Sequence, residues 1–200
     1  MTADIAPGSR RTIVLASRSP RRSELLAAAG ISFEVLAADI DETPHTNEAP
    51  EAYVERLAIE KASAVLALRP GTTVIGADTT VVIDGQILGK PADAQDATDM
   101  LRLLQGRAHD VFTGVAVASA SGVLAAVAHT RVWFRVMTDE DISWYVASGQ
   151  PMDKAGAYGI QGLASRFIDR IDGSYTNVVG LPVAVVFSIL NQEQPIRLRP

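Results

Sequence analysis

The sequence predicts a mixed α/β fold, in which a mixed central sheet is flanked by helices. Short β-branched runs alternate along the chain with longer segments whose apolar residues recur at helical spacing. Two pairs of such runs are separated by turn-like residues, Asp84-Gly85 and the stretch 119–122, as in antiparallel hairpins. The composition, 48% hydrophobic and 20% charged over 200 residues, is typical of a folded domain with a buried core.

The first half of the chain is predicted to alternate between strands and helices. The expected elements are a strand over 12–16, a helix over 23–29 that stops at Gly30, a strand over 33–38, a helix over 51–68 and a strand over 72–83. Lys61 lies within the apolar stripe of the 51–68 helix, which is formed by Val54, Leu57, Val65 and Leu68. The strand over 72–83 is rich in β-branched residues and leads into the Asp84-Gly85 turn.

The second half begins with a helix and continues into a long hairpin. The expected elements are a helix over 93–104 capped by Asp93, antiparallel strands over 111–118 and 123–136, a helix to 148 that starts at a Thr138-to-Asp141 capping box, a Gly-rich loop over 153–162, a strand over 165–171 and a helix from Pro182 to Leu190. We therefore expect one domain over 12–190, with tails at 1–11 and 191–200.

Composition excludes several classes of function. The chain contains no cysteine, which excludes disulfides and thiolate zinc sites and favours a cytoplasmic protein. No apolar run reaches the roughly 20 residues of a membrane helix, and residues 1–11 lack the apolar run of a secretory signal. The net charge of −5 and the lack of a basic tract argue against a nucleic-acid partner. An anionic substrate would need a local cluster of Lys and Arg, with a metal.

The segment from Ser17 to Arg22 is a candidate anion site. It joins a predicted strand to the start of a helix, where free backbone N–H groups and the positive end of the helix dipole favour anions. Ser17, Ser19, Arg21 and Arg22 add side-chain donors there, and the planar arginine fork matches phosphate oxygens. The alternative is a solvated basic loop, and the sequence of a Walker A loop is absent.

Asp78 is the most informative acidic residue, because it lies between two apolar runs of one predicted strand. A carboxylate buried there needs a charged partner or a metal ion, although an Asp that caps a turn is the alternative. Lys61 could serve as a charged site residue or extend from the rim of the core. Lys90 follows the hairpin in Gly89-Lys90-Pro91, where a lysine is usually solvated.

Two loops are further candidates. The acidic loop with Asp39, Asp41 and Glu42 offers hard oxygen ligands for Mg²⁺ or Mn²⁺, although acidic loops are more often solvated. The loop over 153–162 contains Gln161, whose amide can both donate to and accept from a nucleobase edge. The histidines, His45, His109 and His129, lack the spacing of metal ligands.

The motifs taken together resemble the Maf family of nucleoside triphosphate pyrophosphatases, which are also named septum-formation inhibitors. The matching stretches are LASRSPRRSELL (15–26), DIDETP (39–44), ERLAIEKA (55–62), GADTTVVIDG (76–85), GKP (89–91), DKAGAYGIQG (153–162) and NVVGLP (177–182). The resemblance implies two lobes around a nucleotide-binding cleft and a homodimer. It also implies divalent-metal-dependent cleavage of a nucleoside triphosphate to the monophosphate and pyrophosphate.

The resemblance also implies roles for individual residues. Asp78 falls on the family's catalytic position with Lys61 and Lys90, Ser17, Arg21 and Arg22 fall on phosphate-binding positions, and Glu42 and Asp78 fall on metal-handling positions. Arg21, Thr79 and Gln161 match the branch that acts on dTTP and UTP, and modified pyrimidine nucleotides are an extension of that substrate class. The branch that resembles 7-methyl-GTP hydrolases tends to have Trp, Gln and Glu there.

Arg18 departs from the family pattern, in which small residues are common, and places an additional charge near the expected phosphates. Two alternative functions follow from the same resemblance. One is a nucleotide-binding regulator of cell division, and the other is a pyrophosphatase for another base, such as 7-methyl-GTP. The full set of charged site residues favours an enzyme, and Gln161 in place of Glu argues against 7-methyl-GTP.

Overall fold

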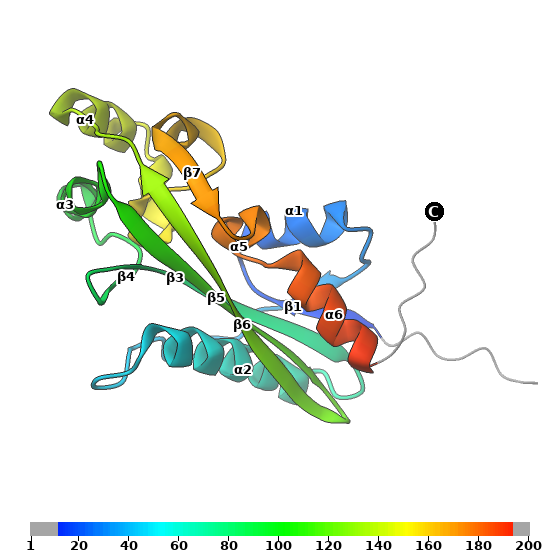
Figure 1. Cartoon of the computed structure of the whole chain (residues 1–200). Helices are drawn as coiled ribbons and strands as arrows, with labels where there is room; N and C mark the ends of the chain where they lie inside the picture. Colours follow the sequence, from blue (N-terminus) through cyan, green and yellow to red (C-terminus); the bar gives the residue numbers. More distant parts are fainter. Residues whose placement is uncertain (1–11, 194–200) are drawn as a thin grey trace, which may run out of the picture.

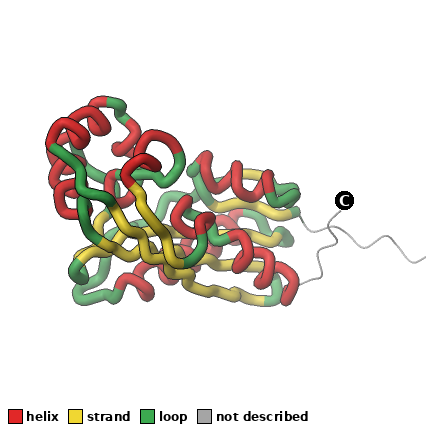
Figure 2. The backbone as a smooth tube through the Cα atoms, turned by 45° about the horizontal axis from the view of Figure 1, so that its top comes forward, coloured by secondary structure: helices red, strands yellow, loops and turns green. Residues whose placement is uncertain are grey.

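The computed structural model describes residues 12–193, in which helices pack on both faces of a seven-stranded sheet (Figures 1 and 2). The strands are β1 (Ile13–Ala16), β2 (Glu34–Val35), β3 (Thr73–Ile83), β4 (Gln86–Leu88), β5 (Ala108–Ser119), β6 (Gly122–Phe134) and β7 (Ile168–Asp172). Their order is β2-β1-β3-β5-β6-β7, with β4 paired to β3. The pairs β1–β2 and β1–β3 are parallel and the others antiparallel, which confirms the mixed sheet.

Six α-helices and three short 3₁₀ segments are present in the described part of the chain. They are α1 (Pro20–Ala28), α2 (Pro50–Leu68), α3 (Ala94–Leu104), α4 (Asp139–Ala147), α5 (Tyr175–Val179) and α6 (Val183–Glu193), with η1 (Gln150–Asp153), η2 (Ala155–Ala157) and η3 (Gly162–Phe167). Helix α2 lies against one face of the sheet, while α1, α5 and α6 lie on the other side (Figure 1). Helices α3 and α4 and the 3₁₀ segments pack around the end of the long hairpin at which β5 begins and β6 finishes.

Two glycines allow α2 to approach the sheet closely. A Cβ atom at Gly76 of β3 would lie 2.2 Å from the Ala58 carbonyl oxygen, and one at Gly114 of β5 would lie 2.1 Å from the Val54 carbonyl oxygen. Since real Cβ atoms do not come this close to backbone, only glycine fits at these two positions. The close contact places the middle of α2, where Lys61 lies, directly over β3.

The edge of β3 has a gap between its two partners. Strand β1 ends at Ala16, which pairs with Gly76, and β4 begins to pair at Val81. Residues 77–80 of β3 are paired with β5 on one side only, within the described part of the chain. This open stretch carries Asp78 and Thr79, so ligands can approach it from the β1 side.

The structure differs from the sequence expectations at several elements. Only 34–35 of the expected strand over 33–38 are paired, because the four-residue β1 offers just Val14 and Leu15 as partners. Residues 162–167 form 3₁₀ turns, so β7 starts three residues later than expected. Helix α1 begins earlier than expected, at Pro20, and α6 extends past Leu190 to Glu193. The predicted tail at 1–11 and residues 194–200 of the predicted C-terminal tail lie outside the described residues.

Two further expectations on helices need correction. Leu68, placed by its spacing on the buried stripe of α2, is 63% exposed because it lies in the last turn, beyond the part that covers the sheet. The short helix α5 was not expected at all. It is stabilised by Ser174, whose side chain accepts a hydrogen bond from the Asn177 backbone N–H. None of the described helices has the length and apolar character that a membrane crossing needs.

His109 lies in the core below the 153–162 loop. It is 1% exposed, its Nε2 lies 2.8 Å from the Tyr158 hydroxyl, and its ring packs edge-to-face against Phe134. Burial lowers the pKa of His109 to about 4. The unfolded chain therefore takes up this proton near pH 6.5, while the folded chain resists it until about pH 4.

This pKa difference predicts a stability loss in mild acid. The contribution of His109 is fully present above pH 6.5 and is lost as the pH falls towards 4. Between pH 7 and pH 5 we expect the wild-type unfolding free energy to fall by about 2 kcal/mol more than that of His109→Gln. Urea titrations of both proteins at the two pH values measure the difference. Parallel pH dependences would show that His109 is not the responsible group.

Candidate active site

A cleft of about 540 Å³ opens beside the unpaired edge of β3. Its walls come from the loop before α1, the acidic loop, the middle of α2, the β3 edge and the 153–162 loop. The residues to which the family resemblance assigns roles all line this cleft: Ser17, Arg21, Arg22, Glu42, Lys61, Asp78, Thr79, Lys90 and Gln161. Residues that are up to 144 positions apart in the sequence, from Ser17 to Gln161, therefore share one site.

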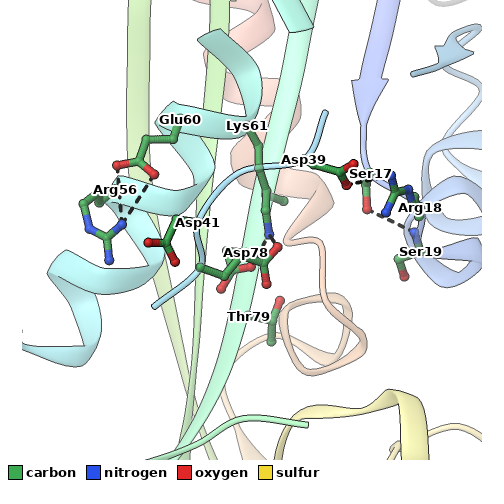
Figure 3. A network of polar contacts seen from close by, with 12 residues as sticks. Ser17, Arg18, Ser19, Asp39, Asp41, Arg56, Glu60, Lys61, Asp78 and Thr79 are labelled. Carbon is green, nitrogen blue, oxygen red and sulfur yellow. Dashed lines mark hydrogen bonds and ion pairs between the residues drawn. The ribbon is translucent and has the colours of Figure 1, made fainter. Parts of the chain in front are cut away.

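Lys61 connects the two carboxylates of the site. Its Nζ lies 2.6 Å from Asp78 Oδ1 and 2.7 Å from Glu42 Oε1, and it extends from α2 down to β3 (Figure 3). Asp78 is 8% exposed, so its charge is buried with a partner, as the position between two apolar runs requires. Burial raises the pKa of Glu42, but the hydrogen bond and charge of Lys61 outweigh it and lower the pKa overall, with help from the charge of Lys90.

The acidic loop is anchored to α2 by residues that the sequence analysis did not single out. The Tyr53 hydroxyl donates to the Glu42 carbonyl at 3.0 Å, and Arg56 donates to the Thr43 carbonyl at 3.2 Å. Arg56 in turn is paired with Glu48 at 2.7 Å. Burial and the nearby carboxylates raise the pKa of Tyr53 to about 12, so its hydroxyl stays a donor. The only sequence signal for these two residues was their spacing. Tyr53 and Arg56 lie one helical turn apart at the start of α2, on the face that contacts the acidic loop.

Only one of the three acids of this loop joins the site centre. Asp39 pairs at 2.7 Å with Arg18, whose side chain is 72% exposed, so the extra charge at Arg18 is held in solvent. Asp41 accepts the Thr43 backbone N–H at 2.9 Å and closes a turn. Figure 3 shows both carboxylates apart from the Lys61–Asp78 contact. Glu42 alone extends to Lys61.

The carboxylates suit a divalent cation that also binds substrate. Within residues 12–193, no group of three or more His, Cys, Asp or Glu side chains could hold a metal ion. The ammonium of Lys61 already holds a positive charge between Asp78 and Glu42. Mg²⁺ is commonly bound by one or two carboxylates together with substrate phosphate oxygens and waters. The donor set therefore fits a cation that arrives with a nucleotide and does not form a closed metal cage.

Arg22 lies deeper in the structure than a solvated loop residue would. Its Nε donates to the Gly180 carbonyl at 2.8 Å, its Nη1 to the Ala77 carbonyl at 2.8 Å and to Ser17 Oγ at 3.2 Å, and its Nη2 to Thr79 Oγ1 at 3.1 Å. Burial lowers the pKa of Arg22. The expected phosphate-binding residue thus directs most of its donors to the protein itself.

Arg21 crosses the cleft. Its Nη1 lies 2.7 Å from Asp153 Oδ2 and its Nη2 lies 3.3 Å from the Asp153 carbonyl oxygen, which joins α1 to the loop that carries Gln161. Burial raises the pKa of Asp153, but hydrogen bonds from Lys154 and Arg21 outweigh it and lower the pKa to about 2. Lys154 also donates to the Gln150 carbonyl at 2.6 Å.

The other two candidates for base recognition, Thr79 and Gln161, differ in the hydrogen-bonding capacity that they have left for a ligand. The Thr79 hydroxyl contacts Arg22 and Thr113 and lies 3.4 Å from the Gly180 carbonyl oxygen, so its hydrogen-bonding capacity is largely used. Gln161 is exposed and lines the cleft. Lys90 also lines the cleft and forms no ion pair among the described residues. A ligand can therefore reach Gln161 and Lys90 directly.

Known proteins are similar to this chain over most of its length. The family described as Maf-like protein matches residues 12–193. A protein of Geobacter metallireducens named dTTP/UTP pyrophosphatase is 56% identical over 176 residues, covering 87% of this chain and 92% of the relative. A protein of the same name from Myxococcus xanthus is 53% identical over 180 residues, covering 90% and 91%.

The fold also occurs in solved structures of lower sequence similarity. The Ham1 protein of Staphylococcus aureus has a TM-score of 0.55 and 16% identity, with coverage of 92% of this chain and 100% of that chain. This likeness supports the fold. The family match spans all of the described residues, and relatives above 50% identity match most of the chain. The chain therefore belongs to the family of Maf-like proteins.

Proposed function

We propose that this chain is a nucleoside triphosphate pyrophosphatase that hydrolyses dTTP and UTP to the monophosphate and pyrophosphate. The observation that carries the proposal is the buried Asp78, bridged through Lys61 to Glu42 at the open edge of β3. A carboxylate held in a cleft lined by Arg21, Lys61 and Lys90 matches a reaction in which water attacks a polyphosphate. The names of the relatives support the choice of dTTP and UTP.

Asp78 is the group that acts on the water. Attack at the α-phosphorus needs a water in line with the leaving pyrophosphate, and a carboxylate beside it orients the water and accepts its proton. The hydrogen bond from Lys61 fixes the orientation of the Asp78 carboxylate before substrate binds. Because the Lys61 side chain itself is mostly buried, this geometry does not depend on a flexible surface group.

The cationic side chains stabilise the leaving pyrophosphate. Negative charge builds up on pyrophosphate as the bond breaks, and preorganised cations at that place lower the barrier. Arg21 and Lys90 line the cleft and supply this charge, with Ser17 and the start of α1 as further donors. Ser19, the residue before α1, makes no side-chain cap there, which leaves first-turn N–H groups available to an anion.

Glu42 and Asp78 are the residues that would hold a divalent cation, Mg²⁺ or Mn²⁺. When bound, this cation supplies neutralisation of the triphosphate charge and polarisation of phosphoryl oxygens. The two carboxylates lie close together because both contact Lys61.

The same proposal includes three predictions from the sequence: a homodimer, a cytoplasmic location and no nucleic-acid partner.

The experiment is a panel of nucleoside triphosphates at substoichiometric protein concentration, with Mg²⁺ or Mn²⁺. We expect sustained turnover that is fastest for dTTP and UTP, and we expect EDTA to stop it. Binding without turnover would instead support a nucleotide-dependent regulator. A preference for 7-methyl-GTP would contradict the assignment of the base.

A further inference from the structure

An extended polar network starts at Arg22 and does not end in the cleft. The guanidinium contacts three separate segments: the loop with Ser17, strand β3 at Ala77 and Thr79, and the turn at Gly180. Four of its five N–H groups are used, since the described bonds involve Nε, both Nη1 protons and one Nη2 proton. Little donor capacity remains for a phosphate.

The network continues through two hydroxyls, those of the half-buried Thr79 and the fully buried Thr113. Thr79 Oγ1 lies 2.9 Å from Thr113 Oγ1, and Thr113 Oγ1 donates at 3.1 Å to the Asn177 carbonyl oxygen. Because the Thr113 proton is used in that bond, the 2.9 Å contact uses the Thr79 proton, for which the Gly180 carbonyl at 3.4 Å is a second and longer acceptor, while Arg22 donates to Thr79. The bonds therefore run in one direction, from Arg22 to Asn177, an arrangement in which each bond polarises the next.

Asn177 anchors the far end of this chain. It is completely buried, and its Nδ2 donates to the Val111 carbonyl at 3.2 Å and to Thr130 Oγ1 at 2.9 Å. Asn177 and Gly180 belong to the NVVGLP stretch, of which Val178, Val179 and Gly180 line the cleft while Asn177 does not. We call Arg22, Thr79, Thr113 and Asn177 the Arg22 brace.

The brace acts on the segment that carries Asp78. In residues 77–80, β3 has no strand partner on the β1 side, and the Arg22 guanidinium donates to Ala77 O where a strand would. It also holds Thr79, so both chain neighbours of Asp78 are fixed by one side chain. Asp78 could shift at this open edge without such support. A displacement of about 1 Å in a reacting group can cost about 100-fold in rate.

We propose that Arg22 is a positioning residue for Asp78, acting through the Arg22 brace, and is not a ligand of the substrate phosphates. This inference rests on the proposed pyrophosphatase function. It assigns a role to the NVVGLP stretch, namely to hold Arg22 and Thr79 on the side of the sheet opposite α2. A phosphate ligand and a positioning residue differ in what their removal changes: the former weakens nucleotide binding, whereas the latter slows the chemical step.

The test compares Arg22→Met with Thr113→Val, a change in the middle of the brace. For each variant, kcat is measured with dTTP, and the Kd of the non-hydrolysable α,β-methylene analogue of dTTP is measured by calorimetry. We expect kcat to fall by about 100-fold in Arg22→Met and by about 10-fold in Thr113→Val, with Kd changed by less than about threefold. The double variant should lose less than the product of the two effects, because both changes break one network.

A rise in Kd of about tenfold or more in Arg22→Met, with kcat in Thr113→Val unchanged, would overturn the proposal in favour of phosphate binding. If Arg22→Met does not fold, as thermal melting would show, Thr113→Val decides alone, and a normal kcat in it rejects the brace. Thr72→Val is the matched control, since it removes one hydroxyl bond to Arg69 just before β3. If the wild-type protein did not turn over dTTP, the proposed function itself would be rejected, whatever the variants show about the brace.

Discussion

Asp78→Asn is expected to lower turnover of dTTP by about 10²- to 10⁴-fold, the range typical of general-base removal. The amide has nearly the same size as the carboxylate, but it cannot accept the proton of the attacking water and it offers no full negative charge. It can still accept a hydrogen bond from Lys61, which keeps Glu42 as a charged partner at 2.7 Å. We therefore expect the variant to fold, and steady-state kinetics with thermal melting measures both properties.

Asp84→Asn is the matched control for this change. Asp84 lies at the turn that ends the same strand, is exposed, and pairs with Arg107 at 2.6 Å outside the cleft. Its positive φ of 52° is compatible with Asn. Near wild-type turnover is expected there. If folded Asp78→Asn were as active as Asp84→Asn, the role given to Asp78 would be wrong.

Gln161→Glu is expected to lower kcat/KM for dTTP and UTP by roughly 5- to 150-fold. Thymine and uracil present O4 as an acceptor and N3–H as a donor, and the Gln161 amide can pair with both. A carboxylate can accept from N3–H but repels O4. The substitution should have a smaller effect on 7-methyl-GTP, so the ratio of kcat/KM between the two nucleotides is the quantity to measure.

Gln150→Leu separates base recognition from loop support. Gln150 accepts the Leu163 backbone N–H at 3.2 Å and so holds the segment that follows Gln161, but it does not line the cleft. We expect this variant to lose activity on both nucleotides to the same extent. A Gln161→Glu variant that behaved in the same way would show that Gln161 is structural and that another residue recognises the base.

Local signals in the sequence were sufficient for most elements. The Asp84-Gly85 turn and the Thr138–Asp141 capping box depend on neighbouring residues only, and both occur as expected. The strand over 33–38 could not be placed in the same way, because its length is limited by β1, a partner elsewhere in the chain. Helix α5 is too short for a periodic signal.

The site residues were found as a set, but their contacts were not. Arg22 lies next to Arg21 in the sequence, and both match an anion site, yet one donates to Ala77 and Gly180 and the other to Asp153. These partners are 55, 158 and 132 positions away. No pattern in the chain shows which arginine directs its donors to the protein, since this depends on the gap at the β3 edge.

Hydrolysis of dTTP in ¹⁸O-labelled water tests the central claim most directly, because the label marks the phosphorus that water attacks. The proposed alignment of Asp78 with the α-phosphorus predicts that dTMP carries the label and that unlabelled pyrophosphate is released. Mass spectrometry of the two products distinguishes the outcomes. Label in pyrophosphate, or release of orthophosphate with dTDP, would contradict attack at the α-phosphorus and with it the role assigned to Asp78.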